Sequence, residues 1–333
     1  MKRRDVLKLA GGGILAGMSA MPRFAFAASQ PSMVVIHKIS GIPWVNLMKS
    51  GVEKGGKDFG VNATLIGPTA ADPAQQAKLI EDVIAQKVDV LGLVPLDVNV
   101  CAPLLARAHD AGIKVITLEG QQQVGRDWDV ALADPTAYGE AQMKKLGALT
   151  GGEGEYVIVV GGLTTPLHKA WADAAVAYQE KNFPKMKQAT ERFGMGESTD
   201  ETQAMVLDVL KAHPKVNGFL LEASPGPIGA GNALKELRNT KVNVIGSCVP
   251  GQASALLKAG YIKECVLWNP VDSGYDMVAV ASLMLKGVAM NDGPMTIPGV
   301  GDATIEVEKK IVQLNKLIEI TTDNVDQYVA QGL

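Results

Sequence analysis

The chain has 333 residues, of which 47% are hydrophobic, and its 32 Lys and Arg against 35 Asp and Glu give a formal net charge of -3 at pH 7. This length exceeds one ordinary hydrophobic core and suits two domains of roughly 150 residues each. Nucleic-acid surfaces need clustered positive charge, and no dense stripe of Lys and Arg follows the first residues. The composition therefore excludes DNA or RNA as a partner.

The first twenty-seven residues predict a cleavable export signal. A basic opening around Arg3-Arg4 precedes a weakly apolar run from Leu9 to Met21, and Ala25-Phe26-Ala27 supplies a small-residue cleavage motif. A membrane anchor would need ~20 strongly apolar residues, whereas this run is shorter and contains four glycines. We expect cleavage after Ala27 and a periplasmic protein. The twin arginines favour the route that exports folded proteins, and the unfolded-chain route stays open.

Cleavage would remove five basic residues and one acidic residue, which leaves 27 Lys and Arg against 34 Asp and Glu. No later apolar run approaches the length of a membrane span. Cys101, Cys248 and Cys265 are an odd set without C-x-x-C spacing, which argues against a disulfide framework or a zinc cluster. Cys248 and Cys265 end and begin neighbouring predicted strands, so one bridge stays open. Buried free thiols are the expectation, and no metal or cofactor is expected.

From Ser32 onward, short apolar runs rich in β-branched residues alternate with amphipathic stretches such as 73–86. Continuous apolar strands linked by helices indicate parallel sheets that are covered on both faces. The fold class predicted is α/β, with two similar doubly wound parallel-sheet lobes joined by a hinge of several segments. The predicted strands are 33–37, 63–66, 88–94, 114–118 and 130–133 in the first series, and 156–160, 188–193, 218–221, 242–246 and 264–268 in the second.

The two series meet at Asp134-Pro135, where we place the boundary between the lobes. A helix-like stretch at 275–285 and a Gly- and Pro-containing stretch at 291–301 indicate that the chain crosses again. The first lobe is expected to comprise 28–134 plus about 270–298, and the second 135–269 plus about 299–333. Asp134, Pro135 and Pro270 are then the expected hinge residues. Clefts between such lobes are favoured binding places.

Ligands of open parallel sheets meet the carboxyl ends of the strands, so polar residues just after each strand are candidate contacts. Lys38 and Trp44 follow the first strand, and this pairing of a cation with an indole suits a hydroxyl or carboxylate beside an apolar face. Glu119 follows the fourth strand, where its carboxylate could accept hydrogen bonds from two adjacent hydroxyls. The later strands add His168, Glu222, Ser224 and Asn269. Together these groups match a small polyhydroxylated molecule.

Each candidate also has a structural alternative. Trp44 could be a core residue, and Trp171 is interpreted as core rather than as a ligand contact. Lys38 and Glu119 could form a salt bridge with each other or at the hinge, because charged groups at the tip of a buried strand need a partner. Asn269 stands before a proline, a pair that is also typical of a turn.

Enzyme signatures are missing from the sequence. It contains no G-x-S-x-G elbow and no G-x-x-x-x-G-K-[ST] loop, and its four histidines lack metal-ligand spacing. Gly229-Ala230-Gly231 lacks the third glycine of a dinucleotide fingerprint, so we interpret it as helix packing. Glu119 and Glu222 are left as a possible glycosidase pair, a reading that depends on a separation of ~5–9 Å that the sequence does not set.

The chain resembles the type I periplasmic sugar-binding proteins of ABC transporters over residues 32–333. Four segments are similar to the rhamnose and autoinducer-2 branch of this family: 35–41, 115–119, 266–274 and 297–301. The resemblance implies a ligand enclosed between the lobes, a permease in the inner membrane as partner, and a monomer. It also implies that Lys38, Trp44, Glu119 and Asn269 contact the ligand.

The chain departs from the family pattern at two places. Autoinducer-2 binders carry Asp-Gln where this chain has Leu167-His168, and Pro-Asp-Ala where it has Glu222-Ala223-Ser224. Ribose binders use an arginine in the loop after the sixth strand, where the nearest candidates in this chain are His168 and Lys169. The predicted function is a receptor that captures a monosaccharide, deoxysugar or polyol by hinge closure. The alternatives are an exported sugar-modifying enzyme, a receptor for chemotaxis or autoinducer-2 uptake, and a sugar-responsive regulator, which would need a helix-turn-helix in place of the export signal.

Overall fold

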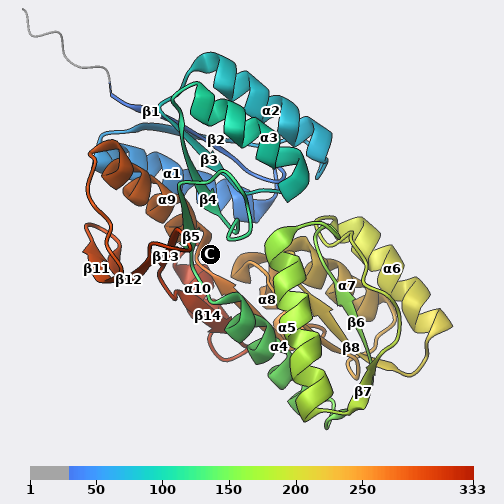
Figure 1. The fold of residues 1–333 in the computed structure, drawn as a ribbon. Helices are drawn as coiled ribbons and strands as arrows, with labels where there is room; N and C mark the ends of the chain where they lie inside the picture. Colours follow the sequence, from blue (N-terminus) through green and yellow to red (C-terminus); the bar gives the residue numbers. More distant parts are fainter. Residues whose placement is uncertain (1–29) are drawn as a thin grey trace, which may run out of the picture.

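The computed structural model describes residues 30–333, which form two α/β lobes (Figure 1). The export signal expected at residues 1–27 lies outside these described residues. Within the described part, no helix is both long and apolar enough to span a bilayer. The first lobe begins with β1 (Ser32–Ile36), α1 (Pro43–Phe59), β2 (Asn62–Ile66), α2 (Pro73–Gln86), β3 (Val90–Leu93), α3 (Val98–Asp110), β4 (Lys114–Leu118) and β5 (Trp128–Ala131).

The second lobe repeats this alternation of strands and helices. Its elements are α4 (Pro135–Leu149), β6 (Glu153–Val159), α5 (Pro166–Asn182), β7 (Lys185–Gln188), α6 (Thr199–Ala212), β8 (Val216–Leu221), α7 (Pro225–Glu236), β9 (Asn243–Gly246), α8 (Pro250–Lys258) and β10 (Glu264–Trp268). The predicted fold class of two doubly wound lobes is confirmed.

The two sheets share one strand order. In the first lobe β2, β1, β3, β4 and β5 are neighbours in that order, and in the second lobe β7, β6, β8, β9 and β10 follow the same pattern, with all of these pairs parallel. In each lobe the order reverses beside the first strand of the series. The crevice at the carboxyl ends of the strands near such a switch point is where open sheets bind ligands.

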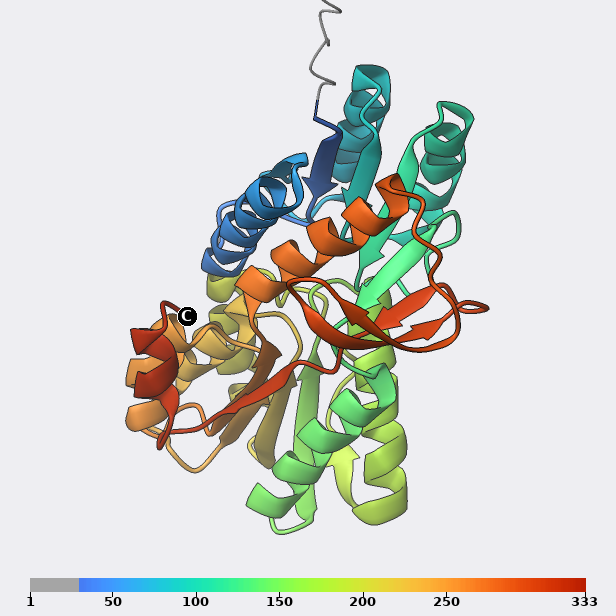
Figure 2. The same ribbon diagram turned by 90° about the vertical axis from the view of Figure 1, so that its left-hand side faces the viewer.

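The C-terminal elements return to both lobes. The helix α9 (Pro270–Leu285) packs on α1, and β11 (Gly293–Ile297), β12 (Gly301–Glu306) and β13 (Ile311–Gln313) extend the first sheet beyond β5. Only then do β14 (Leu317–Ile320) and α10 (Val325–Ala330) join the second lobe, as the orange-to-red chain in Figure 2 shows. The sequence analysis placed the final crossing into the second lobe at about residue 299. This is too early, because β12 and β13 still belong to the first sheet.

The packing of α1 on α9 depends on glycine. A Cβ atom at Gly51 would lie 1.9 Å from the carbonyl oxygen of Val271, and one at Gly274 would lie 2.2 Å from that of Met48. Neither position could hold a larger residue without separating the helices. This close contact fixes α9 on one face of the first sheet, while α2 and α3 cover the other.

Three segments cross between the lobes. Two of them run side by side, since Leu314 N donates to Ala131 O at 2.8 Å and Lys316 N donates to Leu132 O at 2.7 Å. Lys316 Nζ also pairs with the buried Asp276 of α9 at 2.8 Å. The expected hinge residues stand beside these crossings: Asp134 caps α4 through Ala137 N, and Pro135 and Pro270 open α4 and α9.

One strand is misplaced by the sequence analysis. The strand β7 occupies Lys185–Gln188 and ends where the predicted strand 188–193 begins. It is an edge strand in which Met186 is the one apolar residue and the one that is fully buried. The apolar residues after it form a loop in which Phe193 makes a single bridge to Val159.

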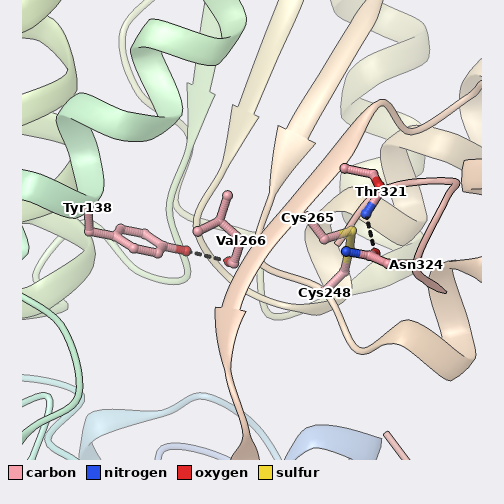
Figure 3. Close-up of a disulfide and its surroundings, with 6 residues drawn as sticks. All are labelled: Tyr138, Cys248, Cys265, Val266, Thr321 and Asn324. Carbon is pink, nitrogen blue, oxygen red and sulfur yellow. Dashed lines mark hydrogen bonds between the residues drawn. A yellow bond between two sulfur atoms is a disulfide. The ribbon is translucent and has the colours of Figure 1, made fainter. Parts of the chain in front are cut away.

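The expectation of free thiols is wrong for two of the three cysteines. Cys248 and Cys265 form a disulfide that joins the loop after β9 to β10, as Figure 3 shows. Nearby, Tyr138 Oη donates to Val266 O at 2.7 Å, and Thr321 N donates to Asn324 Oδ1 at 2.8 Å. Parallel pairing of β9 with β10 places the two cysteines with their Cα atoms 5.7 Å apart. Cys101 is free and buried, and burial raises its pKa to about 12.

We predict that the purified protein, denatured without reductant and alkylated, carries one modification per chain by mass spectrometry. Three modifications would contradict the disulfide. Because the bridge closes a loop of 17 residues, the double variant Cys248→Ala/Cys265→Ala should lose about 3 kcal/mol of unfolding free energy in denaturant titrations. Under non-reducing conditions Cys101→Ala is the matched control, since it leaves the bridge in place.

Candidate functional site

A cavity lies between the lobes at the carboxyl ends of β1, β4, β8 and β10. Six of the seven ligand contacts expected from the sequence line it: Lys38, Trp44, Glu119, His168, Glu222 and Ser224. The other lining residues are His37, Ile42, Trp171, Glu197, Ala223, Ser247 and Trp268. The topology thus brings residues from distant parts of the chain to one place.

Lys38 is the centre of this cavity. Its Nζ donates to Glu119 Oε2 at 2.8 Å within the first lobe and lies 3.5 Å from Glu197 Oε1 of the second lobe. Burial lowers the pKa of Lys38, but the charges of Glu119 and Glu197 raise it by more. The pKa of Lys38 is therefore above its usual value, and the ammonium stays charged. The salt bridge between Lys38 and Glu119, one of the structural alternatives, is present, and Lys38 extends it to the opposite lobe.

His168 brings a second donor toward the same point. Its Nδ1 accepts a hydrogen bond from Gly161 N at 3.0 Å, so the proton of the neutral ring is on Nε2. Burial and the charge of Lys38 hold the pKa of His168 well below its usual value, which keeps the ring neutral. His168 Nε2 lies 3.1 Å from Lys38 Nζ and 3.9 Å from Glu119 Oε2. Two donors this close together can both reach one acceptor oxygen that lies to the side of the pair.

Glu119, whose side chain lines the cavity, has a strained backbone conformation. Its φ of 59° lies in the left-handed region, which costs a non-glycine residue on the order of 1 kcal/mol. Asp129 holds the turn, because its Oδ1 accepts from Gly120 N at 2.8 Å and from Thr117 Oγ1 at 2.6 Å. Burial raises the pKa of Asp129 to about 6. Backbone strain of this kind clusters at ligand sites.

Three tryptophans give the cavity aromatic walls. His37 packs on Trp44 with ring centroids 5.4 Å apart, and His168 stacks on Trp171 at 5.2 Å. The indole N–H groups of Trp171 and Trp268 find no hydrogen-bond partner among residues 30–333. Trp171, interpreted as core from the sequence, packs against Tyr138 at 4.4 Å and also lines the cavity. These walls offer apolar faces together with donors.

Asn269 differs from its expected place. It does not appear in the lining of the cavity, and its Oδ1 accepts a hydrogen bond from Val271 N at 2.9 Å, which makes it the N-cap of α9. Because Pro270 occupies the first position of that helix, the Asn-Pro pair is a helix start. Trp268, one residue earlier, contacts the cavity instead.

The sequence analysis missed Glu197 because it lies in the loop after the misplaced strand β7. Burial raises the pKa of Glu197, and the charge of Lys38 acts in the opposite direction. Across residues 30–333 no group of three His, Cys, Asp or Glu side chains is arranged to hold a metal ion. The arrangement is therefore one of hydrogen-bond donors, carboxyl groups and aromatic faces around one cavity.

The fold is similar to that of several solved structures at low sequence identity. LsrB from Clostridium saccharobutylicum, solved in complex with AI-2, has a TM-score of 0.83 and 18% identity, and covers 89% of this chain and 99% of its own. An ABC transporter solute-binding protein from Clostridium phytofermentas with bound L-rhamnose has a TM-score of 0.84 and 20% identity, with 91% and 99% coverage. At this identity the likeness shows the fold.

Two relatives match by sequence over most of the chain. The xylitol-binding protein of Mycolicibacterium smegmatis is 22% identical over 264 residues, 76% of this chain and 74% of its own length. The ribose import binding protein RbsB of Salmonella typhimurium is 23% identical over 269 residues, 79% of this chain and 88% of its own. A family model for the periplasmic binding protein domain matches residues 33–289, about three quarters of the chain. The chain therefore belongs to the periplasmic binding protein family.

Proposed function

We propose that this protein is the exported solute-binding component of an ABC transporter and that it captures a small polyhydroxylated ligand in the cavity around Lys38. The observation that carries the proposal is the convergence of Lys38, Glu119 and His168 from both lobes on one point of the cavity. Charge-assisted hydrogen bonds to hydroxyl groups, with aromatic faces beside them, are the chemistry that a sugar or polyol needs.

Capture would proceed by closure of the lobes about a hinge. The hinge comprises Asp134 and Pro135, Pro270, and the segment 314–316 between β13 and β14. A ligand shifts the equilibrium between open and closed lobes only through its differential affinity for the closed state. In the proposed complex, Lys38, Trp44 and Glu119 of the first lobe and His168, Glu222 and Ser224 of the second contact one ligand. Such contacts exist together when the lobes are closed.

The named ligands of the relatives support the substrate class. One relative is a xylitol-binding protein, another is a ribose import binding protein, and structural neighbours hold L-rhamnose and AI-2. All four are small molecules with several hydroxyl groups. We propose a monomer in the periplasm, delivered there by the signal in residues 1–27, which hands its ligand to a permease.

The competing function is an exported sugar-modifying enzyme that uses Glu119 and Glu222. A glycosidase needs one carboxyl free to give a proton and another free to attack or to activate water. Here Glu119 is bound to the ammonium of Lys38 at 2.8 Å, an arrangement suited to holding a hydroxyl. We therefore propose binding without turnover.

A thermal-shift screen tests the proposed ligand class. We expect at least one of xylitol, D-ribose, L-rhamnose, D-arabinose and AI-2 to raise the unfolding midpoint, because a ligand that binds only the folded protein adds about 2.7 kcal/mol at a hundredfold excess over its dissociation constant. Chromatography should recover the bound sugar unchanged. A panel with no shift would contradict the ligand class, and a converted sugar would favour the enzyme.

Glu119→Ala should raise the dissociation constant of the ligand found in that screen by about ten- to a hundredfold, as measured by calorimetry. The variant leaves ligand hydroxyls without their acceptor, a loss of about 1–3 kcal/mol. Glu140→Ala, on the exposed face of α4, is the control and should bind as the wild type does. Unchanged affinity in Glu119→Ala would place the ligand elsewhere.

Lys38→Met should lower the unfolding free energy by about 3–5 kcal/mol, because it leaves Glu119 and Glu197 buried without a cation. Denaturant titrations measure the loss. The control is Lys78→Met, which breaks the exposed pair with Asp82 and should leave the midpoint close to that of the wild type. If the two variants lost the same unfolding free energy, the buried ion pairs of Lys38 would not stabilise the fold.

A further inference from the structure

Glu222 is the carboxyl group of the cavity that lacks a partner. It follows β8, is 1% exposed, and lines the cavity. Neither of its carboxyl oxygens has a hydrogen-bond partner among residues 30–333. A carboxylate buried in this position would destabilise the protein unless a proton or a cation neutralised it.

Every cation near the cavity is already engaged. Lys38 is bound to Glu119 at 2.8 Å and lies 3.5 Å from Glu197. Arg192 donates to Asp173 at 2.6 Å. The neutral neighbours of Glu222 on α4 are Tyr138 and Gln142, and His168 on α5 faces the same cavity with its ring uncharged. The charge of an ionised Glu222 would therefore be left without a counterion.

These surroundings favour the protonated form. Burial raises the pKa of Glu222 to about 8, while the amide of Gln142 and the charge of Arg192 act in the opposite direction. The pKa of Tyr138 is raised well above its usual value by burial and by the charge that Glu222 would carry. At neutral pH the side chain is then a carboxylic acid, with one O–H donor and one carbonyl acceptor.

We propose that Glu222 binds the ligand as an uncharged carboxylic acid and thereby selects a neutral polyol or sugar over its acidic and amino counterparts. The inference rests on the proposed function and adds the charge state of the ligand. A hydroxyl group can accept from the O–H of Glu222 and donate to its carbonyl oxygen at once. A ligand carboxylate would be the fourth carboxyl group in a cavity whose one ammonium is already shared by Glu119 and Glu197.

A ligand ammonium is excluded by the same geometry. It would have to enter a cavity that already holds the charged Lys38, and it would need Glu222 ionised. The departure of this chain from the autoinducer-2 pattern at Glu222-Ala223-Ser224 falls at this position. One of the two departures from that pattern therefore lies at the residue to which we assign the charge preference.

The first test uses the protein without ligand. With a pKa of about 8, Glu222 keeps its proton in the folded state up to about that pH, whereas the unfolded chain loses it near the usual glutamate pKa of 4.5. Stability from this group is therefore present at low pH and lost as the pH rises from the unfolded toward the folded pKa. Glu222→Gln lacks this loss, so its melting midpoint should gain a few degrees on the wild type between about pH 5 and about pH 8.

The second test measures dissociation constants for xylitol, D-ribose, L-rhamnose and D-arabinose, and for the aldonate and amino-sugar counterparts of the tightest. Wild-type affinity for the neutral probe should fall about tenfold between about pH 7 and about pH 9, because an ionised Glu222 cannot donate. Glu222→Gln, whose amide keeps a donor and an acceptor, should bind with no such change. Glu236→Gln, exposed at the far end of α7, is the control and should follow the wild type.

The outcomes separate the two proposals. The role of Glu222 would be overturned if a neutral probe bound equally at both pH values. It would also be overturned if the difference in melting midpoint between Glu222→Gln and the wild type stayed constant with pH. Either result would leave the proposed function in place. Tighter binding of the amino counterpart would also overturn it, in favour of an ionised Glu222 paired with a cation. Failure of all four neutral probes, with the midpoint difference present, would overturn the proposed function and the assignment of the ligand's charge together.

Discussion

The site depends on one buried ammonium group that is shared by the two lobes. Lys38 Nζ is bound by Glu119 of its own lobe and lies within 3.5 Å of Glu197 and 3.1 Å of His168 across the cavity. A buried charge is costly unless it is paired, and its partners here come from both lobes. The ion pairs therefore join the two lobes at the cavity.

The rest of the fold positions the partners of this charge. The shared strand order of the two sheets places the ends of β1, β4 and β8 at facing edges. Asp129 holds Glu119 in its left-handed conformation, and the buried amide of Gln76 ties His37 O, Val94 O and Leu96 N together. These contacts fix the segments that carry Glu119 and Lys38. Rigid support of this kind is what a specific hydrogen-bonding site requires.

Much of this arrangement could be predicted from the sequence, because apolar strands and polar strand ends leave clear local patterns. Lys38, Glu119 and Glu222 follow buried strands, and the rule for open sheets places them in one cavity. The sequence did not indicate that Asn269 caps α9, because a helix cap and a ligand contact share the same local signal. Glu197 was missed because β7 is a polar edge strand, and the disulfide was left open because strand pairing, which brings Cys248 to Cys265, is a long-range property.

The central claim is that the ligand lies beside Lys38 and His168, with one oxygen within reach of both nitrogens and its hydroxyl groups on Glu119. A crystal structure of the protein with the tightest sugar or polyol of the screen tests this most directly. The account predicts the ligand enclosed between the lobes, with one oxygen within hydrogen-bonding distance of both Lys38 Nζ and His168 Nε2. A ligand bound outside this cavity, or a cavity in which Lys38 and His168 contact no ligand atom, would contradict it.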